Sequence, residues 1–325
     1  MSNAKIIGTG SALPEKILTN EDMSKIVDTT DEWIRSRTGI RQRRIADEST
    51  STSDLAMIAV EKAVKAAKID PEELDLIIVG TSTPDTLFPS VGCIIQGKIG
   101  AKNASAFDVS AACSGFNFAL TVASNFFKSG MSKKALVVGA DTLAKYLDWT
   151  DRGTCVLFGD GAGAVVLSEA NSGEGILASN LTTDGTGAQF LTMPGGGSRN
   201  PKPNNEKERC ITMNGKEVFK FAVKALEKTL LSALDSAGLT LDKIDLLIPH
   251  QANIRIIDHA MKKFGIPKEK IFVNLDKYGN TSAASIPIAM DEALHNGMIK
   301  KGDIIAIVGF GAGLTSGANI IKWEV

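Results

Sequence analysis

The chain has 325 residues, of which 43% are hydrophobic and 22% charged, and its formal net charge is −1. These values are ordinary for a soluble globular protein with two domains or one large duplicated unit. They exclude a global positive field that would recruit nucleic acid, although local basic faces remain open. The longest apolar runs, such as residues 304–308, are far too short to span a membrane.

The spacing of cysteine and histidine residues indicates which kinds of metal or disulfide site the chain could form. The cysteines stand at 93, 113, 155 and 210 without a C-x-x-C pair, and the chain has three histidines. This pattern predicts neither a metal site nor a disulfide framework. The chain does not begin with a charged and then apolar leader. We therefore expect a cytoplasmic protein with no metal, no membrane and no nucleic-acid partner.

The predicted elements repeat along the chain. A helix over residues 54–68 is followed by an apolar strand at 74–79, and a helix over 221–239 is followed by a strand at 244–248. The offset between the two copies is about 170 residues. Strands that are apolar along their whole length indicate sheets buried on both faces. The repeat therefore predicts two similar α/β halves packed in layers.

Later strands follow the same offset. The strand at 135–140 corresponds to one at 304–309, and the strand that leads to Cys113 corresponds to a predicted strand at 271–275. Between the copies, residues 171–214 are rich in Gly, Asn, Pro and Lys, which predicts a boundary with a long surface excursion. We therefore divide the chain into residues 1–172 and 173–325.

Cys113 stands where a short strand turns into a helix that is apolar on nearly every face. Such a helix is normally buried, and its dipole would favour a thiolate, the nucleophilic form of cysteine, at its start. Free cysteines are also among the most buried residue types, so a small core residue is an equal alternative.

His250 and Asn280 also follow predicted strands. Pro249 helps to end the strand before His250, and the carboxyl ends of strands are where ligand sites of α/β proteins gather. A structural histidine is the alternative for His250, and a helix cap is the alternative for Asn280. His259 and His295 fall within helical patterns and are expected on the surface or in packing.

Two glycine-rich segments have different predictions. Residues 309–313 form a strand-end loop whose spacing does not match a dinucleotide fingerprint. Such a loop can offer backbone N–H groups to a developing oxyanion. Residues 159–163 are expected to form a tight turn.

Five segments together resemble the β-ketoacyl-acyl-carrier-protein synthase III family, from about Ile6 to Trp323. They are Asp-Glu-Trp-Ile at 31–34 with Arg-Thr-Gly-Ile at 37–40, the segment around Cys113, Pro-His-Gln-Ala-Asn at 249–253 with Arg255, Gly-Asn-Thr-Ser at 279–282, and Gly-Phe-Gly-Ala-Gly at 309–313. The resemblance implies an α/β protein with the thiolase-like fold, in which two duplicated halves form a layered α-β-α-β-α arrangement.

The resemblance also implies a reaction. An acyl-CoA primer would acylate Cys113, and malonyl-acyl carrier protein would then lose carbon dioxide and attack the acyl group, giving a 3-oxoacyl-acyl carrier protein. His250 and Asn280 would donate hydrogen bonds to the thioester oxygen, and the backbone N–H groups of Cys113 and Ala312 would form the oxyanion hole. CoA thioester is a substrate, and no cofactor is implied. Elongating relatives have a histidine at the position of Asn280, and thiolases have a late second cysteine, so both departures favour the initiating enzyme.

Binding residues follow from the same resemblance. Trp33 and Arg152 would enclose the CoA adenine, and Arg37 would contact a phosphate. The remaining assignments are the pantetheine arm (Gly215, Phe219, Asn253), the carrier-protein dock (Arg255, Lys262, Lys263) and the acyl pocket (Phe88, Phe310). Phe88 would come from the neighbouring subunit of a homodimer. The identity of the acyl primer stays open.

Three alternatives remain. The closest is a related starter-unit condensing enzyme of polyketide or quinolone type, or a hydroxymethylglutaryl-CoA synthase. A non-catalytic homologue disagrees with the complete set of Cys113, His250 and Asn280. A papain-like hydrolase disagrees with the duplicated pattern and lacks its local signature around the cysteine.

Overall fold

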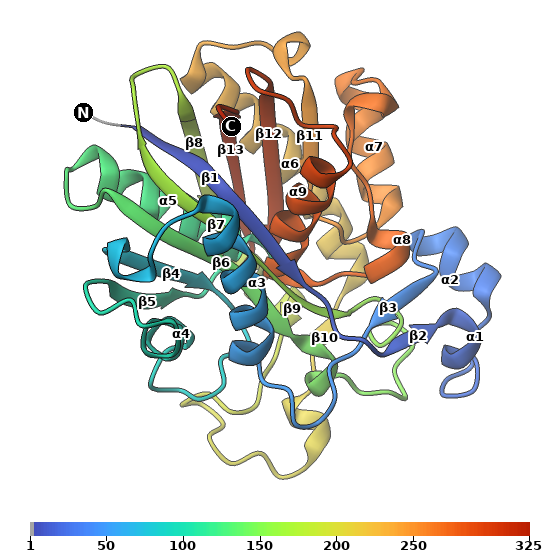
Figure 1. Ribbon diagram of the computed structural model, residues 1–325. Coiled ribbons are helices and arrows are strands. Elements are labelled where there is room, and N and C mark those ends of the chain that lie inside the picture. Colours follow the sequence, from blue (N-terminus) through green and yellow to red (C-terminus); the bar gives the residue numbers. More distant parts are fainter. Residues whose placement is uncertain (1–2) are drawn as a thin grey trace.

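The computed structural model describes residues 3–325 and contains two mixed β-sheets separated and covered by helices (Figure 1). The first sheet has the order β1-β7-β6-β4-β5. Its strands are β1 (Asn3–Ala12), β4 (Leu76–Gly80), β5 (Ser105–Val109), β6 (Lys134–Thr142) and β7 (Asp160–Ala170). The second sheet has the order β11-β12-β13-β8. Its strands are β8 (Gly175–Thr183), β11 (Leu246–Pro249), β12 (Ile304–Gly311) and β13 (Thr315–Lys322).

The helices form three layers around these sheets. Helices α5 (Gly115–Lys128) and α9 (Ser285–His295) lie between the sheets, where α5 contacts β4, β6, β12 and β13. Helices α3 (Thr52–Ala67) and α4 (Val91–Ile99) cover the first sheet, and α6 (Gly215–Ala237) with α7 (Ile254–Phe264) lies on the second. The predicted α-β-α-β-α layering is confirmed.

Smaller elements complete the chain. They are β2 (Ile17–Thr19) paired with β3 (Gln42–Arg44), β9 (Leu191–Thr192) paired with β10 (Thr212–Met213), and the short helices α1 (Asn20–Met23), α2 (Asp31–Thr38) and α8 (Leu275–Tyr278). Among residues 3–325, no helix combines the length and apolar character needed to cross a membrane.

Local signals define the long helices. The side chain of Ser51 accepts a hydrogen bond from Asp54 N–H, and the Asp54 carboxylate accepts one from the Ser51 backbone N–H, so a capping box begins α3. The side chain of Asn214 accepts a hydrogen bond from Glu217 N–H at the start of α6, and Gly238, with a φ of 66°, ends that helix in the left-handed conformation.

The two sheets repeat one topology. β4 pairs in parallel with β5 and β6, and β6 continues antiparallel through β7 to β1. In the second sheet β11 is parallel to β12, which continues antiparallel through β13 to β8. The first sheet is therefore built from residues 3–170 and the second from residues 175–322.

The predicted strand at 271–275 does not form. One bridge joins Ile271 to Leu247, and Leu275 already begins α8. The β-pairing does not continue past this bridge, because the backbone N–H of Asn274 donates its hydrogen bond to the side-chain oxygen of Gln251, at 3.0 Å.

Two other expectations are wrong in detail. Residues 159–163 do not form a tight turn, because β7 begins at Asp160; Gly161 and Gly163 instead let α9 approach the strand. A Cβ on Gly163 would lie 2.7 Å from the Cβ of Pro287. The segment 171–214 is not wholly an excursion either, since it contains β8.

The buried apolar side chains put the centre of the core around α5. Phe116, Leu120 and Phe127 of that helix are fully buried, as is Ile286 of α9. The amino-terminal ends of both central helices consequently lie inside the protein.

Candidate active site

Two related turns precede the central helices. A short 3-10 helix at Ala112–Ser114 leads into α5, and another at Ser282–Ala284 leads into α9. Ala112 and Ser282, which are 170 residues apart in the chain, have positive φ values of 46° and 51°. Non-glycine residues rarely adopt this conformation, and it is concentrated at functional sites. The duplicated halves thus present their equivalent turns to one another.

Cys113 lies in the first turn and is 6% exposed. Burial raises the pKa of its thiol to about 12, although hydrogen bonds with the side chains of Ser282 and Asn280 act to lower it. The expectation of a thiolate favoured by the helix dipole is therefore wrong for the unliganded protein, because loss of hydration dominates.

His250 follows β11 directly and is also buried. Its Nδ1 lies 2.6 Å from the hydroxyl oxygen of Ser285, whereas its Nε2 has no hydrogen-bond partner among the described residues. The ring of Phe310 packs edge-on against the imidazole, with 5.2 Å between centroids. Burial lowers the pKa of His250 to about 3, so the ring is neutral at ordinary pH.

Asn280 is held by backbone and side-chain hydrogen bonds. Its N–H donates to Leu157 O at 2.8 Å, and its carbonyl accepts from Gly159 N–H at 3.0 Å. Its side-chain oxygen accepts the backbone N–H of Ser282 at 2.9 Å. The oxygen therefore forms an Asx turn, whereas the N-cap of the following 3-10 helix is Thr281. The side-chain NH₂ is the donor that acts on the Cys113 thiol.

The β12–β13 hairpin closes over the Cys113 turn. A Cβ on Gly311 would lie 2.6 Å from the Cys113 nitrogen, so only glycine permits this approach. Thr315 Oγ1 lies 2.7 Å from Ser114 Oγ and within 3.0 Å of the carbonyl oxygens of Ala111 and Ala312. Ala312 is not among the described residues with positive φ, which keeps its N–H available in an ordinary conformation.

A small cavity of about 80 Å³ adjoins Cys113. It is lined largely by apolar side chains; the lining comprises Ser82, Ala112, Cys113, Leu143, Phe158, Leu191, Thr192, Met193, Ile211, Ser282 and Ala312. Phe310 is not part of this lining, because it lies against His250. Sequence reasoning missed Ser282, Ser285 and Thr315; the run of small residues at 281–285 was the available signal for the first two.

The predicted nucleotide-binding residues gather around Trp33. The guanidinium carbons of Arg37 and Arg152 lie 4.6 and 5.0 Å from the centre of the indole ring. Arg152 also pairs with Asp28 at 3.5 Å. An aromatic base could enter between Trp33 and Arg152 only if the arginine moved away.

The other predicted binding residues are spread over α6, α7 and one loop. Gly215 begins α6, and the ring of Phe219 on this helix contacts His259 of α7 edge-on. Asn253 accepts the backbone N–H of Arg255 at the start of α7.

The basic residues of α7 and the loop residue Phe88 are accessible. Arg255, Lys262 and Lys263 are exposed, and Lys263 pairs with Glu227 of α6. Phe88 is 86% exposed and does not line the cavity beside Cys113.

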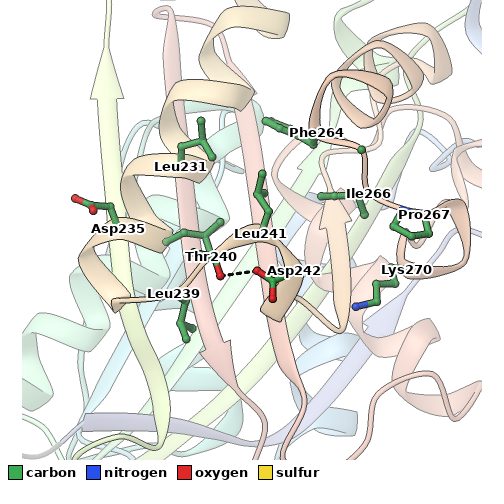
Figure 2. Close-up of a pocket in the computed structure, with 12 residues that line it drawn as sticks. Leu231, Asp235, Leu239, Thr240, Leu241, Asp242, Phe264, Ile266, Pro267 and Lys270 are labelled. Carbon is green, nitrogen blue, oxygen red and sulfur yellow. Dashed lines mark hydrogen bonds between the residues drawn. The ribbon is translucent and has the colours of Figure 1, made fainter.

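A second hollow lies on the outer side of the second sheet. This open groove of about 710 Å³ runs between the end of α6 and residues 264–270, with Leu231, Leu241 and Phe264 on its walls (Figure 2). None of the predicted site residues lines it. Within residues 3–325, no cluster of three or more His, Cys, Asp or Glu side chains is arranged to hold a metal ion.

Comparison with known proteins places the chain among condensing enzymes. The family model described as 3-oxoacyl-[acyl-carrier-protein (ACP)] synthase III matches residues 107–185, and the model of its C-terminal part matches residues 234–323. The β-ketoacyl-[acyl-carrier-protein] synthase III of Caldanaerobacter subterraneus is 56% identical over 99% of this chain and 98% of its own length.

Solved structures of proteins from the same family also resemble this chain. The 3-oxoacyl-[acyl-carrier-protein] synthase III of Aquifex aeolicus is 49% identical, with a TM-score of 0.92 over 98% of this chain and all of its own. A priming β-ketosynthase from the R1128 polyketide pathway is 35% identical, with a TM-score of 0.93 over 99% of this chain and 97% of its own. The sequence match over the full length and the shared thiolase-like fold show that this chain belongs to the 3-oxoacyl-[acyl-carrier-protein] synthase III family.

Proposed function

We propose that the protein catalyses the initiating condensation of fatty-acid synthesis, in which an acyl-CoA primer is joined to malonyl-acyl carrier protein. The observation that supports this proposal is that buried Cys113 and Asn280 interact across the two equivalent turns. Buried His250 packs against Phe310 of β12, the strand whose Gly311 contacts the Cys113 turn. The family membership of the full chain supports the same reaction.

In the first half-reaction, the sulfur of Cys113 attacks the thioester carbon of acyl-CoA. The carbon–sulfur bond to CoA breaks, and the thiol proton of Cys113 leaves with CoA as its thiol. The N–H groups of Cys113 and Ala312 stabilise the oxyanion, an interaction that is worth about 3 kcal/mol for one donor. The thiol is buried and neutral at rest, so its proton leaves only when the substrate is in place.

In the second half-reaction, the malonyl thioester loses carbon dioxide and becomes an enolate. Hydrogen bonds from His250 Nε2 and the Asn280 amide stabilise the negative oxygen. The enolate carbon attacks the acyl group on Cys113, the thioester to the cysteine breaks, and the sulfur takes up a proton. The product is 3-oxoacyl-acyl carrier protein.

The substrate arms would use the accessible residues. CoA adenine inserts at Trp33 once Arg152 swings aside, Arg37 contacts phosphate, and the pantetheine passes Gly215, Phe219 and Asn253. The acidic carrier protein docks on Arg255 and Lys262; Lys263 contributes less because Glu227 already neutralises it. Since all four cysteines are free thiols, we place the protein in the cytoplasm. The proposed reaction uses the CoA thioester as a substrate and needs no cofactor.

A homodimer is the second part of this proposal. Leu87 and Phe88 are neighbouring apolar residues that are 83% and 86% exposed, and such residues mark interfaces. Phe88 would close the acyl pocket of the partner subunit. A protein carrying L87D and F88D should sediment as a monomer and should acylate poorly. A dimer of unchanged stability in that variant would refute this assignment.

Intact-mass measurement after incubation with acyl-CoA tests the reaction. The wild-type protein and the C93A variant, which loses an exposed cysteine away from the site, should each gain one acyl group, whereas C113A should gain none. Malonyl-acyl carrier protein should then discharge the adduct and yield the 3-oxo product. An adduct on C113A would contradict the role of the cysteine, and condensation only onto malonyl-CoA or another acceptor would favour a starter-unit synthase.

A further inference from the structure

The contact between His250 and Ser285 determines which nitrogen of the imidazole can act on substrate. Ser285 is the first residue of α9, and its hydroxyl oxygen lies 2.6 Å from His250 Nδ1. Both residues are buried, at 1% and 2% exposure, so water does not compete for this bond.

The hydroxyl hydrogen of Ser285 has one evident acceptor. The Ser285 oxygen receives the backbone N–H of Gln251 at 3.4 Å, so that contact uses a lone pair and leaves the hydrogen available. Among the hydrogen bonds described for residues 3–325, the only acceptor facing this hydrogen is His250 Nδ1. If Nδ1 carried the ring hydrogen instead, the serine hydrogen would be buried without a partner, which costs roughly 1–3 kcal/mol.

A neutral imidazole that accepts a hydrogen bond at Nδ1 carries its own hydrogen on Nε2. The Nε2 atom of His250 is buried and has no partner among the described residues. It is therefore a hydrogen-bond donor that is available for a ligand of the proposed site.

The duplication adds an independent observation. At the offset of 170 residues, the counterpart of Ser285 at the start of α5 is Gly115, which has no side chain. The hydroxyl is present only in the half whose central helix faces the histidine.

We propose that Ser285 is a positioning residue that holds His250 in the Nε2–H tautomer, so that this hydrogen is donated to the malonyl thioester oxygen as the enolate forms. This inference rests on the proposed function for its chemical purpose. The tautomer itself can be tested without any substrate.

Nitrogen NMR of protein labelled with ¹⁵N-histidine tests the tautomer directly, with the His250 signals identified by their loss in H250N. The wild-type spectrum should show a protonated Nε2 and a bare Nδ1. S285A should move the ring toward a mixture of tautomers, and S285T, which restores a hydroxyl, should return it. A wild-type His250 with its hydrogen on Nδ1 would overturn the proposal.

The two half-reactions provide the second measurement. S285A should lower the rate of malonyl decarboxylation by roughly 10- to 100-fold while changing the acylation of Cys113 less than about twofold. S124A is the matched control, because Ser124 is equally buried and its hydroxyl has no partner among the described residues. Equal decarboxylation by S285A and S124A would overturn the role of Ser285. Failure of the wild-type protein to acylate would instead refute the proposed function and leave the NMR result standing.

Discussion

Gly311 lies so close to Cys113 that a Cβ on the glycine would stand 2.6 Å from the cysteine nitrogen. The same Cβ would lie 3.1 Å from the nitrogen of Ser114. The hairpin between the last two strands is therefore seated directly on the backbone donors of the nucleophile turn. A side chain at position 311 would push the hairpin away from Cys113, and it would separate the two N–H groups that we propose as the oxyanion hole, those of Cys113 and Ala312.

We expect G311A to reduce both half-reactions by about 100-fold or more, because an oxyanion-hole donor is displaced in each. Single-turnover acylation and the condensation rate measure the two losses. G97A is the control: Gly97 lies in α4 with nothing within 4 Å of an added Cβ. That variant should keep full activity and gain about 0.5–1 kcal/mol in unfolding free energy. Acylation by G311A at the wild-type rate would contradict the assignment.

The second prediction concerns the thiol. Because burial raises the pKa of Cys113 to about 12, alkylation of the unliganded protein by iodoacetamide should accelerate roughly tenfold per pH unit from pH 7 to pH 10. The measurement follows the mass of Cys113 peptides, with C113A as the blank. A rate that levels off below pH 8 would indicate a preformed thiolate and would restore the helix-dipole explanation.

The third prediction concerns stability and pH. Burial lowers the pKa of His250 from 6.5 to about 3. Between these pH values, His250 is protonated in the unfolded chain and neutral in the folded protein. The wild-type protein therefore loses stability through this residue as the pH falls from 6.5 toward 3. H250N lacks the effect, and its unfolding free energy relative to wild type should rise by about 1.4 kcal/mol for each pH unit in that window.

Urea unfolding at pH 4.5, 5.5 and 7 measures this difference. Comparison of two proteins cancels other groups, such as Asp160, whose pKa is raised to about 6 by burial and which acts with the opposite sign. Between pH 7 and 8 the gap should be constant. A constant gap at all pH values would mean that His250 has the same pKa in the folded protein as in the unfolded chain.

The fourth prediction concerns Thr315, whose hydroxyl joins Ser114 to the carbonyl oxygens of Ala111 and Ala312. T315V should cost about 1–3 kcal/mol in unfolding free energy, because buried polar atoms lose a partner. Acylation and condensation should fall together, by roughly 10-fold, because the oxyanion hole serves both. T315S should recover most of the rate. A selective loss of decarboxylation would show that Thr315 acts through His250 or Asn280 instead.

The buried strands and the duplication could be predicted from the sequence. Apolar runs mark β4, β6, β11 and β12 within two residues, because a strand buried on both faces admits few polar side chains. Cys113, His250 and Asn280 could likewise be singled out, because strand ends and turns are local features. The strand expected at 271–275 failed because a side chain from another loop, that of Gln251, took its backbone hydrogen bond.

The sequence by itself determined which residue types occupy the loops after the apolar segments, and that the chain repeats at an offset of about 170 residues. Only the tertiary structure decided the surroundings and the protonation states of those residues. In the folded protein Gly311 contacts Cys113, and Ser285 contacts His250. Burial removes water from the Cys113 thiol and the His250 imidazole, so both groups are uncharged. These properties depend on contacts between residues up to about 200 positions apart. A local sequence pattern does not show which distant residues meet or which side chains lose their hydration, so it cannot predict these pKa shifts.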